Sequence, residues 1–365
     1  MTTTRPILLL LVGLVAGLAL SLAPEARSGR PAEPAQLLEL SDALEELSAQ
    51  VLRSTVHIFV ESQVDGRKSG SSGTGFVVDA IQGLVVTNNH VVNPPHEGDQ
   101  DPSKVFVKVT LADGRVFPAE IVARDELTDI AVVRIPEGAA RRQLSWGDSD
   151  QLRPGTMVMA VGNPLGLVGT TSTGVISGLN RSVGILRGDG YEDFLQHDAV
   201  IDQGSSGGPL VNMRGELVGV NTAISPDQQR KAQMGMHSWN GVSFSVPSRL
   251  ARKVAEDLVE FGEVRRGYLG VDTEDLDASR AKRSGLPRPF GAYIKEVMPD
   301  TPAAGAGLKV GDILLEVDGR EVLGPSSLRS RISAYSPGDL ARIKIWRNKA
   351  AIELQVELAI KPKKG

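Results

Sequence analysis

The succession of short apolar segments between residues 56 and 247 constrains the fold of this chain more than any other feature. The segments are rich in β-branched residues, and Gly, Asp or Pro separates them, as in VHIFVE, GLVVT, VFVKVTL and IAVVRI. Such segments are typical of β-strands bounded by turns. No helical pattern of roughly 10–15 residues lies between them, which excludes a parallel sheet of βαβ units. The pattern therefore predicts a mostly β, antiparallel domain of two sheets or two barrels.

A change of pattern after Pro247 marks the end of this domain. Leu250, Val254 and Leu258 recur at helical spacing and Gly262 follows, so we expect a connecting helix there. The rest of the chain is long enough for a second, smaller domain. The predicted organisation is a β domain at 55–247, a linker helix at 248–265 and a second domain at 266–361.

Composition excludes several classes of function. The 40 basic and 44 acidic side chains give a net charge of −4, without the cationic surplus typical of nucleic-acid-binding proteins. The absence of cysteine excludes disulfides, thiol catalysis and cysteine-ligated metal sites. No P-loop string is present, so we expect a protein that does not use ATP. We also expect no other cofactor and no metal.

The first 27 residues have the parts of an export signal. Arg5 precedes an apolar run over residues 7–22, which ends in small residues. This length lies between a typical signal core and a membrane span, and Pro24 weakens a cleavage site after Ala23. Two outcomes are open: a cleaved signal peptide, or an uncleaved membrane anchor formed by residues 7–22.

Residues 28–54 combine a spacer with a helical segment. Its apolar residues are spaced alternately by three and four: Leu37, Leu40, Leu44, Leu47 and Val51. About two heptads are too short to hold a coiled coil alone, which favours a helix packed on its own domain over an oligomer zipper.

The string GSSGGP at residues 204–209 carries the candidate chemistry. Glycines around a serine let backbone N–H groups approach a developing oxyanion. By itself the string fits the G-x-S-x-G elbow of α/β-hydrolases, the G-x-S-G-G of chymotrypsin-like proteases, or a turn without chemistry. An elbow requires a helix after the serine, whereas the residues after Ser206 predict a strand. His90 and Asp129 precede Ser206 in the chymotrypsin order, so we favour that interpretation.

The roles follow from where the protons must go. Ser206 is a weak nucleophile until a base takes its proton, and His90 has a near-neutral pKa suited to that step. Asp129 would hold the imidazole in one tautomer, and the N–H groups of Gly204 and Ser206 would form the oxyanion hole. The other histidines have no role in this scheme: His57 lies in an apparent strand, His96 and His237 lie in loops, and His197 is too close to Ser206 in sequence.

Several motifs resemble the HtrA (DegP/DegS) family of serine proteases: SGTGFVVD, TNNHVV, LTDIAVVRI, GNPLGL and DAVIDQGSSGGPLVNMRGELVGVNTAI. In the second domain RGYLGV and GLKVGDILLEVDGREV resemble a PDZ domain. The resemblance implies two six-stranded chymotrypsin-like barrels with the site between them, followed by one PDZ domain. It also implies a triad of His90, Asp129 and Ser206, a homotrimer, and export to the bacterial periplasm or cell envelope. An uncleaved run at residues 7–22 would tether the protein to the inner membrane. Ser205 replaces the asparagine common in the family.

The resemblance also suggests residues for substrate recognition. Val200, six residues before the nucleophile, would lie at the base of the S1 pocket and disfavour basic residues there, and Ile224 would line the same pocket. An ordinary place in the barrel core is an equally open reading for both. In the PDZ domain a peptide C-terminus would meet Tyr268, Leu269, Gly270 and Val271, with Leu328 and Ile332 on the helix opposite. A small β fold that only braces the protease is the alternative.

Three functions remain open. The leading one is an ATP-independent endopeptidase of the cell envelope that cleaves misfolded or regulatory proteins, with the PDZ domain serving recognition or activation. The second is a PDZ-containing chaperone or scaffold with little or no proteolysis. The third is a membrane-tethered signalling protease whose PDZ domain senses the C-terminus of a misfolded partner.

Overall fold

A computed structural model describes residues 34–361, apart from residues 65–66, 94–104, 164–168, 187–189, 203 and 225–240. The predicted signal or anchor at residues 1–27 lies outside this range. So do His96 and His237. Within the described ranges, no helix combines the length and apolar character needed to cross a bilayer.

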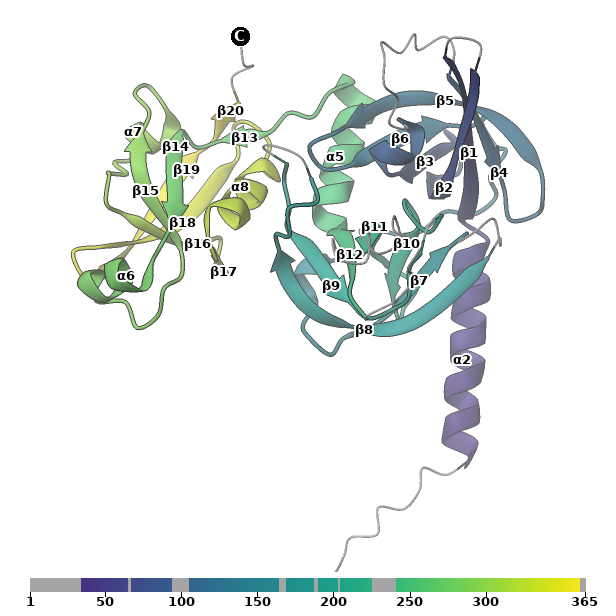
Figure 1. The fold of residues 1–365 in the computed structure, drawn as a ribbon, viewed down its shortest axis with the longest axis horizontal. Coiled ribbons are helices and arrows are strands. Elements are labelled where there is room, and N and C mark those ends of the chain that lie inside the picture. Colours follow the sequence, from purple (N-terminus) through teal and green to yellow (C-terminus); the bar gives the residue numbers. More distant parts are fainter. Residues whose placement is uncertain are drawn as a thin grey trace, which may run out of the picture. The chain divides into compact units, whose positions relative to one another are not determined.

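The first barrel contains the strands predicted from residue 56 onward (Figure 1). Its strands are β1 (Thr55–Val64), β2 (Arg67–Asp79), β3 (Leu84–Thr87), β4 (Val105–Thr110), β5 (Val116–Asp125) and β6 (Ile130–Arg134). They close antiparallel in the order β1-β2-β3-β6-β5-β4. Val56, Ile58 and Val60 are buried while His57 and Phe59 between them are less so, as expected for alternating faces of a strand.

The second barrel repeats the arrangement. Its strands are β7 (Met157–Gly162), β8 (Thr170–Arg181), β9 (Phe194–His197), β10 (Pro209–Asn212), β11 (Leu217–Ile224) and β12 (Ser243–Pro247). They close antiparallel in the order β10-β11-β12-β9-β8-β7. Small and medium aliphatic side chains fill the core, among them Val158, Ile176, Leu195 and Leu210. The mostly β, double-barrel fold expected from the sequence is confirmed.

The described residues of this region also form the helices α2 (Pro34–Leu52), α3 (Asn89–Val92) and α5 (Ser248–Phe261) and the 3-10 helix η2 (Ser149–Gln151). Helix α5 buries Leu250, Val254 and Leu258 and ends at Gly262 in the left-handed conformation, as predicted. In α2 Leu47 and Val51 are buried, but Leu37 and Leu40 are exposed. The preference for a helix packed on its own domain agrees with the end of α2, where Leu47 and Val51 are buried.

The residues after 266 form a second β-rich domain. Its elements are β13 (Gly267–Tyr268), β14 (Val271–Asp275), α6 (Ala278–Ser284), β15 (Ala292–Val297), α7 (Pro302–Gly305), β16 (Ile313–Val317), β17 (Arg320–Glu321), α8 (Pro325–Ser333), β18 (Leu340–Arg347), β19 (Ala350–Glu357) and β20 (Ala359–Ile360). The main sheet has the order β14-β15-β16-β18-β19, and β13 pairs with β20. Strand β14 is therefore an edge strand of the main sheet, which leaves one side of it for an added strand.

Candidate active site

His90 and Asp129 meet through two hydrogen bonds. His90 lies in helix α3, directly after strand β3, and Asp129 lies just before strand β6, which pairs with β3. The imidazole Nδ1 is 2.7 Å from Asp129 Oδ2, and the His90 backbone N–H donates to Asp129 Oδ1 at 3.0 Å. Because a carboxylate accepts, Nδ1 carries the proton and Nε2 is left as the basic nitrogen.

Asp129 is held firmly in this position. Its side chain is buried, and its backbone adopts a left-handed conformation with φ of 57°. Its carbonyl oxygen accepts bonds from the Asn88 side chain at 2.8 Å and from the Asn89 N–H at 3.0 Å. Sequence reasoning did not single out Asn88, although its place in TNNH next to His90 was a usable signal.

The pair shifts the basicity of His90. Desolvation by the surrounding protein lowers the pKa of His90, but the negative charge of Asp129 and its hydrogen bond raise it by more, so the net pKa is raised above its usual value. A base that is stabilised in its protonated form is suited to receive a proton from a serine hydroxyl.

The turn that carries Ser206 is fastened to the first barrel by Thr74. The Thr74 N–H donates to the Ser206 carbonyl at 2.9 Å, and its hydroxyl donates to the Gly204 carbonyl at 2.6 Å. The same hydroxyl accepts the Asn163 N–H at 2.9 Å. Thr74 is fully buried, so these bonds compete with no solvent. The predictions did not include Thr74, because nothing in its local sequence shows that it reaches residue 204.

Gly207 allows the close approach between the two barrels. Its φ is 82°, and a Cβ on it would lie 2.2 Å from both the Thr74 carbonyl oxygen and the Thr87 hydroxyl. Both neighbours are buried, so neither can move aside cheaply. This position accepts only glycine, which sets Ser206 next to the strand end that leads to His90.

The bond between Ser206 and His90 is not formed in this structure. Ser206 Oγ donates instead to the Thr222 carbonyl at 3.4 Å. Catalytic hydrogen bonds are often long in unliganded sites and tighten with substrate, so this geometry does not disqualify the pair. Within the described residues, neither the Gly204 N–H nor the Ser206 N–H donates to a backbone carbonyl.

The two residues expected in the substrate pocket lie in different situations. Val200 is 48% exposed and its carbonyl accepts the Ser172 hydroxyl at 2.7 Å, so it is not part of the barrel core. Ile224 ends strand β11, but its side chain lies outside the described residues.

The residues predicted to bind a peptide lie along one edge of the second domain. Tyr268 ends β13, Val271 begins β14, and Leu269 between them is buried. Gly270 has a φ of 87°, and a Cβ there would lie 2.3 Å from the Thr301 side chain. On helix α8, Leu328 and Ile332 are buried in the same core cluster as Leu269. The two buried leucines and Ile332 are therefore shared between the fold and any peptide pocket.

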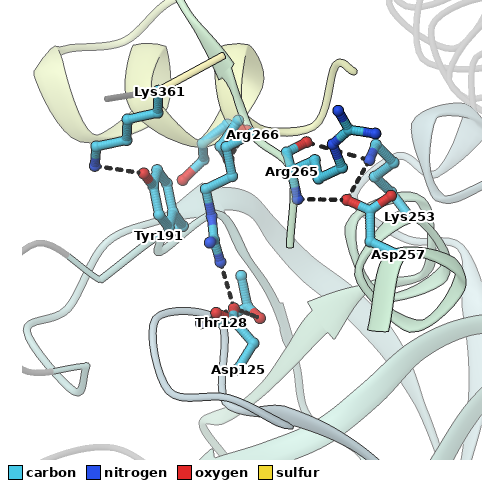
Figure 2. A network of polar contacts seen from close by, with 10 residues as sticks. Asp125, Thr128, Tyr191, Lys253, Asp257, Arg265, Arg266 and Lys361 are labelled. Atoms are coloured by element: carbon cyan, nitrogen blue, oxygen red, sulfur yellow. Dashed lines mark hydrogen bonds and ion pairs between the residues drawn. The ribbon is translucent and has the colours of Figure 1, made fainter. Parts of the chain in front are cut away.

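A buried polar network supports the segment before Asp129 (Figure 2). Asp125 Oδ2 accepts the Thr128 N–H at 3.0 Å and the Thr128 hydroxyl at 2.5 Å, and it forms an ion pair with Arg266, the first residue of the second domain. The Arg266 guanidinium lies 4.7 Å from the Tyr191 ring, and Tyr191 also accepts a bond from Lys361 at 2.9 Å. The network joins the turn of the candidate aspartate to both ends of the second domain, a link that sequence reasoning missed.

The part of the chain that the structure describes contains no cluster of three or more His, Asp or Glu side chains able to hold a metal ion. His90, Asp129 and the turn around Ser206 provide the groups for proton transfer and nucleophilic attack.

Comparisons with known proteins agree with this geometry. Residues 73–220 match the trypsin-like peptidase domain, and residues 267–358 match the PDZ domain. The chain is 38% identical over 286 residues to the periplasmic pH-dependent serine endoprotease DegQ of Escherichia coli K12, a match that covers 78% of this chain and 59% of DegQ. It is 36% identical over 287 residues to the periplasmic serine endoprotease DegP of the same strain, covering 78% of this chain and 56% of DegP. The chain thus spans less than two thirds of the length of these relatives.

Solved structures match this chain over nearly their full resolved length. The HtrA-type protease AlgW with a tripeptide is 31% identical and superposes with a TM-score of 0.64, covering 88% of this chain and 98% of that one. The serine endoprotease from Yersinia pestis is 29% identical with a TM-score of 0.54.

Proposed function

Because the chain belongs to the HtrA family of serine proteases, we propose that it is an ATP-independent serine endopeptidase that cleaves misfolded or regulatory proteins. The proposal rests on one observation: His90 and Asp129 are joined by two hydrogen bonds, and they accompany a glycine-rich turn that carries Ser206. A scaffold without proteolysis would have no use for this pair, so we rank the chaperone alternative second.

In the proposed mechanism Ser206 Oγ attacks the scissile carbonyl carbon while His90 Nε2 takes the hydroxyl proton. The negative charge that develops on the carbonyl oxygen is received by the N–H groups of Gly204 and Ser206. His90 then returns the proton to the leaving amine, and a water molecule hydrolyses the acyl-enzyme by the same route in reverse. Asp129 keeps Nδ1 protonated and stabilises the imidazolium throughout.

For specificity we propose that Val200 and Ile224 line the S1 pocket. The exposure of Val200 supports this, because a core valine would be covered. An S1 pocket with an apolar, uncharged floor accepts small or medium aliphatic side chains and offers a lysine or arginine no counter-ion.

We propose that the domain at 266–361 binds the C-terminus of a peptide as an extra strand on β14, with its carboxylate at the turn from Tyr268 to Val271. The free edge of β14 supports this. Peptide binding to this domain would affect the active site through Arg266, because Arg266 forms an ion pair with Asp125, four residues before Asp129. The peptide site would then serve recognition, activation or both.

The organisation of the whole chain belongs to the same proposal: a signal or anchor at 1–27, a spacer and helix at 28–54, a protease domain at 55–247, a linker helix at 248–265 and a PDZ domain at 266–361. The curated relatives are named periplasmic, which supports export of this chain to the periplasm. A homotrimer is expected from the family resemblance, and an inner-membrane tether through residues 7–22 is expected from the apolar run there.

Reaction of the purified protein with a fluorophosphonate probe tests the proposed activity. We expect mass spectrometry to find the label on Ser206, and we expect Ser206→Ala to lose both labelling and casein cleavage while it stays folded. Ser205→Ala is the matched control, because it removes the neighbouring hydroxyl of the same turn and should keep the label.

Label on a different residue, or casein cleavage by Ser206→Ala above background, would refute the triad. Absence of label even with casein and C-terminal peptides added would favour the scaffold.

A further inference from the structure

A buried histidine that the proposed mechanism does not use lies inside the second barrel. His197 on β9, Ser245 on β12 and Asn221 on β11 belong to three adjacent strands, and all three side chains are fully buried. His197 Nε2 is 2.9 Å from Ser245 Oγ, and Ser245 Oγ is 3.0 Å from Asn221 Oδ1. The three form a continuous polar chain across a barrel whose other core residues are mostly aliphatic.

The direction of each bond in this chain can be assigned. The Asn221 amide nitrogen donates to the carbonyls of Pro209 at 3.3 Å and Val161 at 3.4 Å, so its oxygen Oδ1 must accept. Ser245 has one proton and gives it to that oxygen, so Ser245 Oγ must accept from His197 Nε2–H. His197 is therefore the Nε2–H tautomer, and its Nδ1 is buried without a partner among the described residues.

The chain ends at the turn that carries the nucleophile. The Asn221 N–H donates to the Gly208 carbonyl at 2.8 Å, and its carbonyl accepts the Gly207 N–H at 2.8 Å. With the side-chain bond to Pro209, Asn221 holds the backbone of the three residues that follow Ser206. The orientation of the Asn221 amide thus bears on where that backbone lies.

We propose that His197 is a positioning residue for the Ser206 turn, acting through Ser245 and Asn221. Without the proton donated by His197, Ser245 is free to rotate its own proton away from Asn221. The Asn221 side chain, which holds the Pro209 carbonyl, then loses its fixed partner, and the Asn221 backbone that bonds Gly207 and Gly208 can shift with it. A catalytic hydroxyl must be held closely to its reacting geometry, so a small displacement of the turn slows the chemical step.

The charge state of His197 is consistent with a fixed donor. Burial lowers the pKa of His197 to about 4, against weaker opposing effects of the Ala199 backbone and the Asp198 carboxylate. The ring is therefore neutral at pH 7, and the tautomer is set by the bond to Ser245.

The expected effect on the reaction rate rests on the proposed function. The expected effect on the position of the Ser206 turn rests only on the hydrogen bonds within the barrel. The test compares His197→Met, which fills the space without a donor, with His197→Gln, whose amide can donate in place of Nε2. His57→Met is the matched control, because His57 is a partly buried histidine of the first barrel whose Nε2 also lacks a partner in the described structure.

We expect His197→Met to lower kcat and the rate of fluorophosphonate labelling about tenfold with little change in KM, since the turn and not the pocket is displaced. His197→Gln should restore most of the rate, and His57→Met should match the wild type. A wild-type kcat in His197→Met would overturn the proposal, as would an equal loss in His57→Met.

Nuclear magnetic resonance separates the positioning role from the activity itself. The His197 ring nitrogens should report the Nε2–H tautomer, and the amide signals of Gly207 and Gly208 should move in His197→Met and not in His57→Met. If the wild type takes no label but these signals move, the proposed activity fails while the positioning role stands. Unmoved amide signals would reject the positioning role whatever the activity. Ser245→Ala, which breaks the same chain at its middle, provides the same readouts should His197→Met not fold.

Discussion

Replacing Gly207 with alanine tests how the two barrels hold the nucleophile turn. Two costs add at this position. A left-handed φ of 82° costs an L-residue roughly 1–2 kcal/mol, and a Cβ 2.2 Å from a backbone oxygen adds an overpacking cost of about 1–3 kcal/mol. We therefore expect Gly207→Ala to lower the free energy of unfolding by about 2–5 kcal/mol.

Gly207→Ala should also slow the reaction of Ser206 by more than the loss of folded protein explains. The Cβ must clear both the Thr74 carbonyl and the Thr87 hydroxyl, so the turn has to withdraw from the first barrel by something on the order of 1 Å. Displacements of that size reduce the rate of an enzymatic step by about a hundredfold. We expect that loss in the fluorophosphonate labelling rate of Ser206, measured below the unfolding transition.

Gly114→Ala provides the matched control. Gly114 has a φ of 84°, and nothing lies within 4 Å of the position its Cβ would take. Gly114→Ala should therefore lose only the free energy of the left-handed backbone, without the overpacking. Urea unfolding and labelling rates of the two variants separate the two costs. If Gly207→Ala is no less stable than Gly114→Ala and labels at the wild-type rate, the close packing inferred around the turn is wrong.

Two further predictions concern ionisable groups. Asp129→Asn should reduce kcat by about 10⁴-fold and, because Asp129 raises the pKa of His90, should move the acidic limb of the pH–rate profile to lower pH; an unmoved limb would contradict the assignment of the base. Burial raises the pKa of Asp193 from 3.8 to about 6, against the opposing charge of Arg331, so the folded state holds this proton longer than the unfolded state and loses stability as the pH rises through that interval. Asp193→Asn should then stabilise the protein at pH 7.5 by on the order of 2 kcal/mol and have no such effect at pH 3.5. Equal effects at both pH values, measured by thermal unfolding, would contradict the raised pKa of Asp193.

Much of the fold is visible in the local pattern of residues. In strand β1 successive side chains point to opposite faces, so the segment VHIFVE alternates between buried and less buried residues. Helix α5 has a buried face because Leu250, Val254 and Leu258 recur at helical spacing. Periodicity is a property of neighbouring residues, so it can be read without knowing the rest of the structure. The order of His90, Asp129 and Ser206 along the chain is likewise a property of the sequence.

The first half of α2 shows the limit of that reasoning. Its leucine stripe is as regular as that of α5, yet Leu37 and Leu40 remain exposed. Spacing shows that a face is apolar but does not show which surface covers it.

What the sequence determined by itself is therefore the class of the fold, the division into a β domain and a second domain, and the residue types available for chemistry. The tertiary structure alone decided how these residues are held. Thr74 lies 130 positions before Gly204, Asp125 lies 141 before Arg266, and His197 lies 48 before Ser245. Hydrogen bonds over such separations depend on strand order and register in closed barrels, which arise from the packing of the whole chain and leave no local pattern.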